Sequence, residues 1–144
     1  MPLNARSQAP ASFWIIAVLG LLWNLLGCYD YLMSQLSPQS YFASMGMDDA
    51  SVAYMAQLPV WLTGFWALGV WGSLVGSLLL LARSRRAVLA FALSLLGLAV
   101  SQLTQAFWLH PPMAAPVGLA LTVWSALVFF LIHARSMAAK GVLS

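Results

Sequence analysis

The stretch from Pro59 to Arg86, PVWLTGFWALGVWGSLVGSLLLLARSRR, decides the fold class of this chain. Its apolar part, from Val60 to Ala82, is 23 residues long and carries no charge. As a helix it is about 35 Å long, which is enough to cross a hydrocarbon core of about 30 Å. A soluble helix without a polar face needs a large protein around it, and a chain of 144 residues cannot provide one. The stretch therefore predicts a membrane span.

The composition of the whole chain agrees with this interpretation. It is 62% hydrophobic and 6% charged, whereas a soluble domain has about 25% charged residues. The net charge of +3 does not indicate a nucleic-acid partner, because the six basic residues stand in short clusters beside the apolar runs and form no basic face. Cys28 is the only cysteine, so the chain lacks the paired thiols of a thiol-disulfide enzyme, and we interpret Cys28 as a small packing residue.

Three further apolar runs predict three more spans. Together they give an all-α integral membrane four-helix bundle, a single transmembrane domain over residues 1–144 with spans at about 11–32, 60–82, 87–109 and 117–133. A signal peptide is the competing interpretation of the first run, since Arg6 precedes it. The run is longer than a typical signal core, is bulky at its far end, and no small-x-small cleavage site follows closely, so we expect a retained helix.

Two connections contain local structural signals. The outer loop, residues 33–58, contains Asp48-Asp49-Ala50-Ser51, which is typical of a helix start with acidic residues near the positive end of the helix dipole. It predicts a short amphipathic helix from Asp49 to Leu58 at the membrane interface. Between the third and fourth spans, His110-Pro111-Pro112 is expected to break the helix.

The charged residues predict the orientation of the spans. With four spans, all the basic residues fall on one side of the membrane and all the acidic residues, Asp30, Asp48 and Asp49, on the other. The basic residues that set this topology are Arg6, Arg83, Arg85, Arg86, Arg135 and Lys140. Because basic residues near the ends of spans stay in the cytoplasm, both termini are expected to be cytoplasmic. Aromatic anchors are expected at the outer interface (Trp61, Trp108, Tyr29, Tyr31) and at the inner one (Trp14).

Small residues on the second span predict close helix packing. Gly69, Gly72, Ser73 and Gly76 lie on one side of it, together with Ser77, and Gly72 and Gly76 have the small-xxx-small spacing. In lipid, close backbone approach over small residues is a main source of helix association. We expect this face to pack against another span of the same chain, and a homodimer contact is the alternative.

Polar residues in the first and third spans predict a candidate pocket. Asn24 shares a face with Gly20, Gly27, Cys28 and Tyr31, whereas Ser94, Gly97, Ser101 and Gln105 share a face of the third span. If these two faces meet, polar groups gather near the outer ends of the spans; they are Asn24, Asp30, Tyr31, Ser101, Gln102 and Gln105, with His110 nearby. We expect these groups to make interhelical hydrogen bonds worth about 0.6 kcal/mol each, and a binding site is the alternative. His133 and His110 lie on opposite sides, so no metal site and no cofactor are expected.

Several segments between about residues 13 and 105 carry a resemblance to known proteins: Leu22-Trp23-Asn24, Gly27, Tyr29-Asp30-Tyr31, Ala53-Tyr54, Leu58-Pro59-Val60-Trp61, Trp66-Ala67-Leu68-Gly69-Val70-Trp71-Gly72, Leu78-Leu79-Leu80-Leu81 and Ser94-Leu95-Leu96-Gly97. The chain resembles a family of small four-helix bacterial inner-membrane proteins whose members are often labelled as sugar transporters. The resemblance implies a multi-pass inner-membrane protein and adds transport to the possible functions.

The sequence leaves three classes of function open. We expect a non-catalytic membrane component that acts through helix packing, as a homo-oligomer or as an accessory subunit of a larger membrane complex. Its partners would be the lipid bilayer and another membrane protein or a second copy, with no nucleic acid. The alternative is a transporter or channel for a small neutral solute such as a sugar, although no charged residue lies at mid-membrane, where ion-coupled transporters usually keep one. A membrane enzyme is not expected, because the charged or paired-cysteine motifs of small four-helix membrane enzymes are absent from the sequence.

Overall fold

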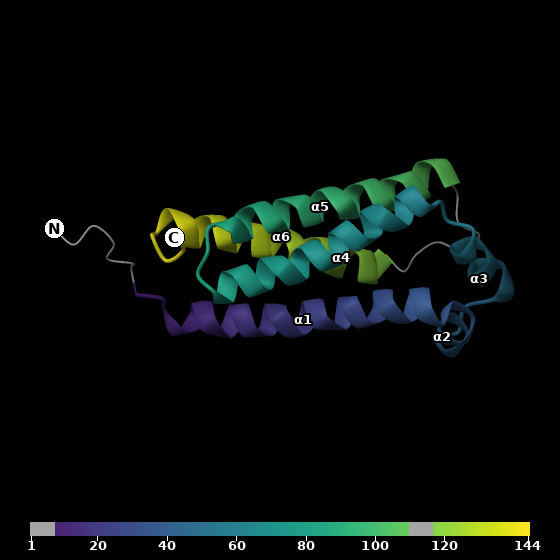
Figure 1. The fold of residues 1–144 in the computed structure, drawn as a ribbon, viewed down its shortest axis with the longest axis horizontal. Helices are drawn as coiled ribbons and strands as arrows, with labels where there is room; N and C mark the ends of the chain where they lie inside the picture. The colour runs from purple at the N-terminus through teal and green to yellow at the C-terminus, as the bar shows by residue number, and fades with distance from the viewer. Residues whose placement is uncertain (1–7, 110–116) are drawn as a thin grey trace.

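The computed structural model of the chain describes residues 8–109 and 117–144 and consists of four long helices with two short ones at one end (Figure 1). The long helices are α1 (Ala11–Leu36), α4 (Val60–Leu81), α5 (Arg86–Thr104) and α6 (Val117–Ala139). A π-helical turn, η1 (Gln105–Leu109), continues α5. Each of the four is long and apolar enough to cross a membrane. The predicted fold class, an all-α bundle of four apolar helices, is confirmed, and the chain is a multi-pass membrane protein by this criterion.

The first and last helices are longer than the sequence predicts. α1 runs to Leu36 instead of about 32, and α6 to Ala139 instead of about 133. In the last turns of α1, the hydroxyl of Ser34 donates to the carbonyl oxygen of Asp30 at 2.7 Å. Such a bond satisfies the serine hydroxyl within the helix itself, so Ser34 is accommodated inside α1.

The segment between α1 and α4 folds into two short helices at one end of the bundle, α2 (Pro38–Ser44) and α3 (Asp49–Ala56) (Figure 1). α2 has a proline in its first turn, where no backbone donor is needed, and the sequence reasoning missed it. α3 confirms the predicted helix start: the Asp48 carboxylate accepts from the backbone N–H of Ser51 at 2.8 Å. Hydrogen bonding from Ser51 also holds the pKa of Asp48 below its ordinary value.

The turn between α4 and α5 holds the last residues of the chain. Arg83 ends α4 in the left-handed region, at φ 56°. Ser84 N–H donates to Leu79 O at 2.9 Å and Arg83 N–H to Leu80 O at 2.9 Å, which are the two bonds of a Schellman C-cap. Residues 142–144 lie against this turn: Arg83 Nε donates to Val142 O at 2.9 Å, and Ser144 N–H donates to Arg83 O at 2.9 Å. These contacts tie the end of α6 to the α4–α5 hairpin.

The apolar core lies toward this same end of the bundle and is built from all four long helices and the residues that follow α6. The rings of Phe91 on α5 and Phe130 on α6 stack with their centroids 5.8 Å apart. The core residues are Phe13, Ala17, Leu80, Ala87, Phe91, Leu127, Phe130, Ala134, Met137, Val142 and Leu143. In contrast, large apolar side chains such as Ile15, Leu26 and Ile132 are exposed on the outer surface, as expected for helices that face lipid.

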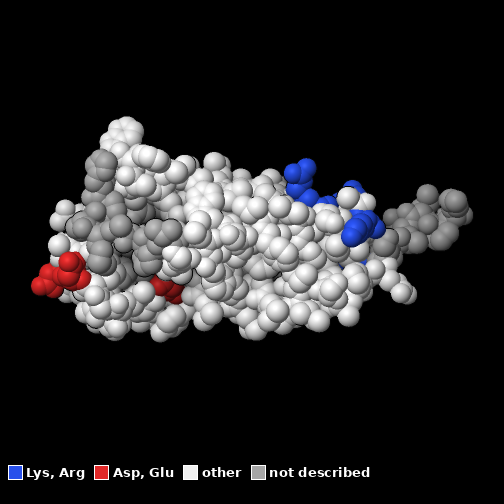
Figure 2. All heavy atoms as spheres, turned by 180° about the vertical axis from the view of Figure 1, so that it is seen from behind, with Lys and Arg blue, Asp and Glu red and all other residues white. Residues whose placement is uncertain are grey.

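The charged side chains separate to the two ends of the bundle (Figure 2). Arg83, Arg85 and Arg86 in the α4–α5 turn, with Arg135 and Lys140 at the end of α6, form the basic end. Asp30, Asp48 and Asp49 form the acidic end, together with α2 and α3. The segregation of charge that the sequence predicts is therefore present for these residues, whereas Arg6 and the predicted break at His110-Pro111-Pro112 lie outside the described residues.

Candidate functional site

Asn24, at the middle of α1, does not meet the third span as predicted. Its side chain is 7% exposed and contacts α4. Asn24 Nδ2 donates to Ser77 Oγ at 2.6 Å and to Ser73 O at 3.1 Å, and the Ser73 hydroxyl donates to Asn24 Oδ1 at 3.0 Å. One turn further along α1, the Cys28 thiol is buried and lies 3.9 Å from Val70 O. The polar face of α1 is therefore satisfied by α4, and the packing role expected for Cys28 is confirmed.

Polar residues of the third span also have hydrogen-bond partners, either on other helices or within their own helix. Ser94 donates to Gly69 O on α4. The Trp124 indole of α6 donates to Gln102 Oε1 at 2.6 Å. Gln105 donates to its own helix, at 3.3 Å from Ser101 O. The Tyr54 hydroxyl of α3 lies 3.5 Å from Gln105 Oε1, a long contact. The predicted meeting of the Asn24 face of the first span with the Gln105 face of the third span is therefore wrong.

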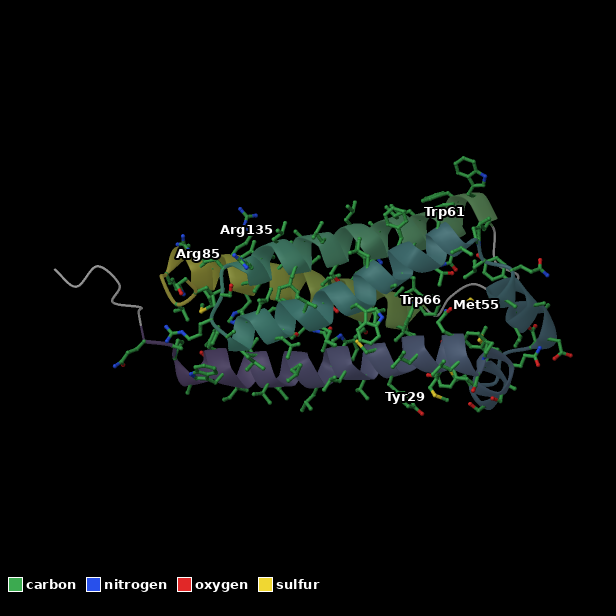
Figure 3. All side chains as sticks on the ribbon, viewed as in Figure 1. Tyr29, Met55, Trp61, Trp66, Arg85 and Arg135 are labelled. Atoms are coloured by element: carbon green, nitrogen blue, oxygen red, sulfur yellow. The ribbon has the colours of Figure 1, made fainter. Side chains whose placement is uncertain are left out.

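The two remaining residues of the predicted pocket also have separate partners. Asp30 accepts a 2.6 Å hydrogen bond from the Tyr41 hydroxyl of α2, and this bond raises the pKa of Tyr41 to about 12. Tyr31 is partly buried, with its ring edge-to-face against Trp66 and Trp71 of α4 at centroid distances of 5.0 and 6.3 Å. Tyr31 is therefore a packing residue and not the interfacial anchor that we expected. Tyr29, labelled in Figure 3, is exposed. The six predicted residues do not form one pocket.

The glycines of α4 pack against α5, as the preferred prediction had it. A Cβ on Gly72 would lie 3.3 Å from Ser94 Cβ, and one on Gly69 would lie 3.2 Å from the backbone nitrogen of Leu98. A Cβ on Gly76 would lie 2.8 Å from the Phe91 ring. Ser73 is different, because it contacts Asn24 on α1. The predicted small face is thus divided between two neighbouring helices of the same chain.

A groove between α1 and α6 was not predicted. It has a volume of about 340 Å³ and is lined almost wholly by apolar atoms. The hydroxyl of Thr122, which lines the groove, donates to Gly118 O at 2.8 Å. The lining residues are Ile16, Leu19 and Trp23 of α1 and Thr122, Ala126, Phe129 and Phe130 of α6.

A histidine next to Phe129, one of the groove residues, has a buried ring nitrogen without a hydrogen-bond partner. His133 lies one turn after Phe129 on α6, and its imidazole stacks on Phe129 and on Phe13 of α1, with centroid distances of 6.0 Å in both cases. Its Nε2 atom is buried and has no partner among the described residues. Among the described residues, Ser51 Oγ is the only other buried side-chain nitrogen or oxygen without a hydrogen-bond partner. The sequence contains a signal for this arrangement, since Phe129, His133 and Lys140 recur at spacings of four and seven residues.

A second, wider hollow of about 680 Å³ lies between α2 and α3 at the acidic end. Small and polar residues such as Ser37, Gln39 and Ala53 make up much of its lining. Among residues 8–109 and 117–144, no group of three or more His, Cys, Asp or Glu side chains is placed to hold a metal ion.

Comparison of this chain with protein families, with curated proteins and with solved structures finds no match in any of the three.

Proposed function

We propose that this chain is a non-catalytic component of a bacterial inner membrane, with its basic end in the cytoplasm, which acts through lateral association as a homo-oligomer or as an accessory subunit of a larger membrane complex. The topology follows from the charges at the two ends of the bundle, since basic residues beside spans stay in the cytoplasm.

One observation carries the proposal: several polar side chains within the described spans, Asn24, Ser73, Ser94 and Gln102 among them, hold neighbouring helices together. Asn24 bonds to Ser73 and Ser77, Gln102 to Trp124, and Ser94 to Gly69. A carrier or an enzyme usually keeps some of its intramembrane polar groups available for substrate. In this bundle such groups stabilise the fold instead, and what remains on the sides of the helices is an apolar surface.

Mild detergent extraction of the native protein, followed by native mass spectrometry, tests this proposal. We expect a defined homo-oligomer or a stable complex with another membrane protein. A monomer without any protein partner, at a protein concentration well above that in the membrane, would contradict it. Extraction of the Gly72→Leu/Gly76→Leu variant is not a suitable control, because those glycines face α5 of the same chain.

Transport of a neutral solute remains the second candidate, because one feature favours it. Tyr31, Trp66 and Trp71 form a partly buried aromatic group near the acidic end, and aromatic rings of this kind stack on the apolar faces of sugars. A panel of sugars added to the purified protein, with thermal unfolding as the readout, tests this candidate. A concentration-dependent rise in Tm that Trp66→Leu abolishes would favour transport over the non-catalytic role.

A further inference from the structure

The hollow between α2 and α3 combines apolar carbon with a few polar groups. Its volume of about 680 Å³ falls within the range of about 300–1,000 Å³ that small-molecule sites occupy. Asp49, Val52, Ala53 and Ala56 recur at the spacings of one helical face, so α3 contributes a carboxylate and a short apolar wall to the same space. The lining on the other side, from α2 and its flanks, consists of Ser37, Pro38, Gln39, Ser40, Ala43 and Met47.

Two polar side chains of this hollow are not used to hold the fold together. The Asp49 carboxylate and the Gln39 amide have no hydrogen-bond or ion-pair partner among the described residues, and both side chains are exposed. The other two carboxylates of the chain are engaged: Asp48 caps α3, and Asp30 accepts a hydrogen bond from α2. Asp49 is therefore the acidic side chain that remains available to a ligand.

Charge complementarity indicates what the hollow would hold. The acidic side chains lie at this end of the bundle, and the described part of the chain carries Lys and Arg only at the opposite end (Figure 2). A bound anion would therefore meet a carboxylate without a basic side chain to offset it. The positive end of the α3 dipole does not change this, because Asp48 and Asp49 already stand at it. An ammonium group, in contrast, can pair with Asp49.

We propose that this hollow binds a small organic cation from the solution at the acidic end, with its ammonium at Asp49, its apolar body against Val52, Ala53 and Ala56, and a hydrogen bond to Gln39. The proposal is independent of the proposed function. The headgroup of phosphatidylethanolamine also offers an ammonium, but it brings a phosphate beside it, for which the described part of this end has no Lys or Arg. A free amine with an apolar body matches the lining better.

The test uses the full chain in a neutral detergent at neutral pH, with 1-adamantylamine and 1-adamantanol as probes. The two share one apolar cage and differ in an ammonium against a hydroxyl. Isothermal titration calorimetry, with the detergent alone as the reference, gives the affinities. We expect a saturable 1:1 complex with the amine that is about two- to fivefold tighter than that with the alcohol, the contribution of one exposed ion pair. The preference should shrink as salt is raised to about 1 M. Equal affinities at low salt, or no saturable binding, would overturn the proposal.

Asp49→Asn and Asp48→Asn form a matched pair. Both remove one carboxylate from the start of α3, but Asp49 lines the hollow and Asp48 does not. Asparagine caps a helix about as well as aspartate, so Asp48→Asn keeps α3. We expect Asp49→Asn to erase the preference for the amine and Asp48→Asn to keep most of it. Equal losses in both variants would mean general attraction of a cation to an acidic surface, and would overturn the assignment of the site.

A second matched pair tests the apolar wall. Ala53→Phe fills the hollow and should weaken both probes, whereas Ala50→Phe adds the same ring on α3 outside the lining and should weaken neither. Both alanines are exposed, so neither substitution disturbs the core of the bundle. Unchanged binding in Ala53→Phe would place the probes elsewhere and overturn the proposal.

A competition experiment distinguishes a free cation from a lipid headgroup. Palmitoyl-oleoyl phosphatidylethanolamine and the matching phosphatidylcholine are added in turn to the detergent before the amine is titrated. We expect the two lipids to leave the affinity for 1-adamantylamine equal. Selective displacement of the amine by phosphatidylethanolamine would show that the site takes a headgroup, and would overturn the assignment to a free cation.

Discussion

Asn24 and Ser73 exchange two hydrogen bonds between α1 and α4: Asn24 Nδ2 donates to Ser73 O at 3.1 Å, and the Ser73 hydroxyl donates to Asn24 Oδ1 at 3.0 Å. The pair is buried, and Ser77 accepts the second proton of the amide at 2.6 Å. An amide in this environment satisfies both its donor and its acceptor without water. The pair therefore fixes both the rotation and the axial register of α1 against α4.

Replacing Asn24 with Leu should weaken the contact of α1 with α4 without unfolding the protein. Interhelical hydrogen bonds in membranes are worth about 0.6 kcal/mol each on average and at most about 1.7 kcal/mol, and three bonds are lost. We expect a loss of about 1–2 kcal/mol in the free energy of unfolding, measured by titration with sodium dodecyl sulfate. A double-mutant cycle with Ser73→Ala should give a coupling energy near 0.6 kcal/mol, and a coupling of zero would show that the observed bond contributes nothing.

Glycine positions differ sharply in what an added methyl group would meet. At Gly97 of α5 a Cβ would lie 2.6 Å from Phe65 O and 2.7 Å from the Gly69 nitrogen, both backbone atoms of α4. At Gly27 of α1 nothing lies within 4 Å. Gly97→Ala must therefore push α4 and α5 apart, and we expect a loss of at least about 3 kcal/mol, at the upper end of overpacking costs.

Gly27→Ala is the matched control for this substitution. It adds the same methyl group in a helix interior and should leave stability unchanged or raise it by up to about 1 kcal/mol through helix propensity. Gly72→Leu/Gly76→Leu should also separate α4 from α5, although the Phe91 ring that faces Gly76 can move more easily than backbone. Equal effects of Gly97→Ala and Gly27→Ala on the unfolding midpoint would contradict the close approach of the two helices.

The sequence predicts which segments form helices better than it predicts which helices touch. Uncharged runs of about 20 residues are a local property, and the four spans were found for that reason. The neighbours of each helix depend on matching surfaces between four similar apolar helices, and single-helix patterns do not distinguish them. Asn24 was correctly expected to be engaged, but its partners on α4, Ser73 and Ser77, had been counted with the glycine face.

The angular positions of the small residues around α4 explain why the partners of Asn24 were missed. Gly69, Gly72 and Gly76 cluster within about 60° of arc, whereas Ser73 and Ser77 lie about 60–100° to one side at 100° per residue. The glycines face α5 and the serines face α1, so one apparent stripe of small residues serves two interfaces. The groove between α1 and α6 could not be predicted at all, because it is a space between two helices that are far apart in the sequence, and no local pattern encodes it.

The bond between Tyr41 and Asp30 predicts how α2 responds to alkali. Because Asp30 accepts from the phenol, the pKa of Tyr41 rises from 10.0 to about 12. A raised folded-state pKa means that the bond contributes its full stability below pH 10 and loses it as the pH rises toward about 12. The late phenolate should be visible by ultraviolet titration and should be missing in Tyr41→Phe. Asp30→Asn should move it to lower pH, and an unchanged titration in that variant would exclude Asp30 as the cause.

The orientation of the bundle can be tested with cysteines at its two ends. In a Cys28→Ala background, Ala139→Cys places an exposed thiol at the basic end and Ser44→Cys places one at the acidic end. Ser51, although closer to the acidic residues, is only 4% exposed and is unsuitable. In right-side-out vesicles an impermeant maleimide should label Ser44→Cys and spare Ala139→Cys, and a permeant maleimide should label both. The reason is the set of basic residues in the α4–α5 turn and at the end of α6, which resist translocation, whereas acidic residues contribute little to orientation. The reverse labelling would show that this set does not control insertion, and equal labelling of both sites would indicate a protein that inserts in two orientations.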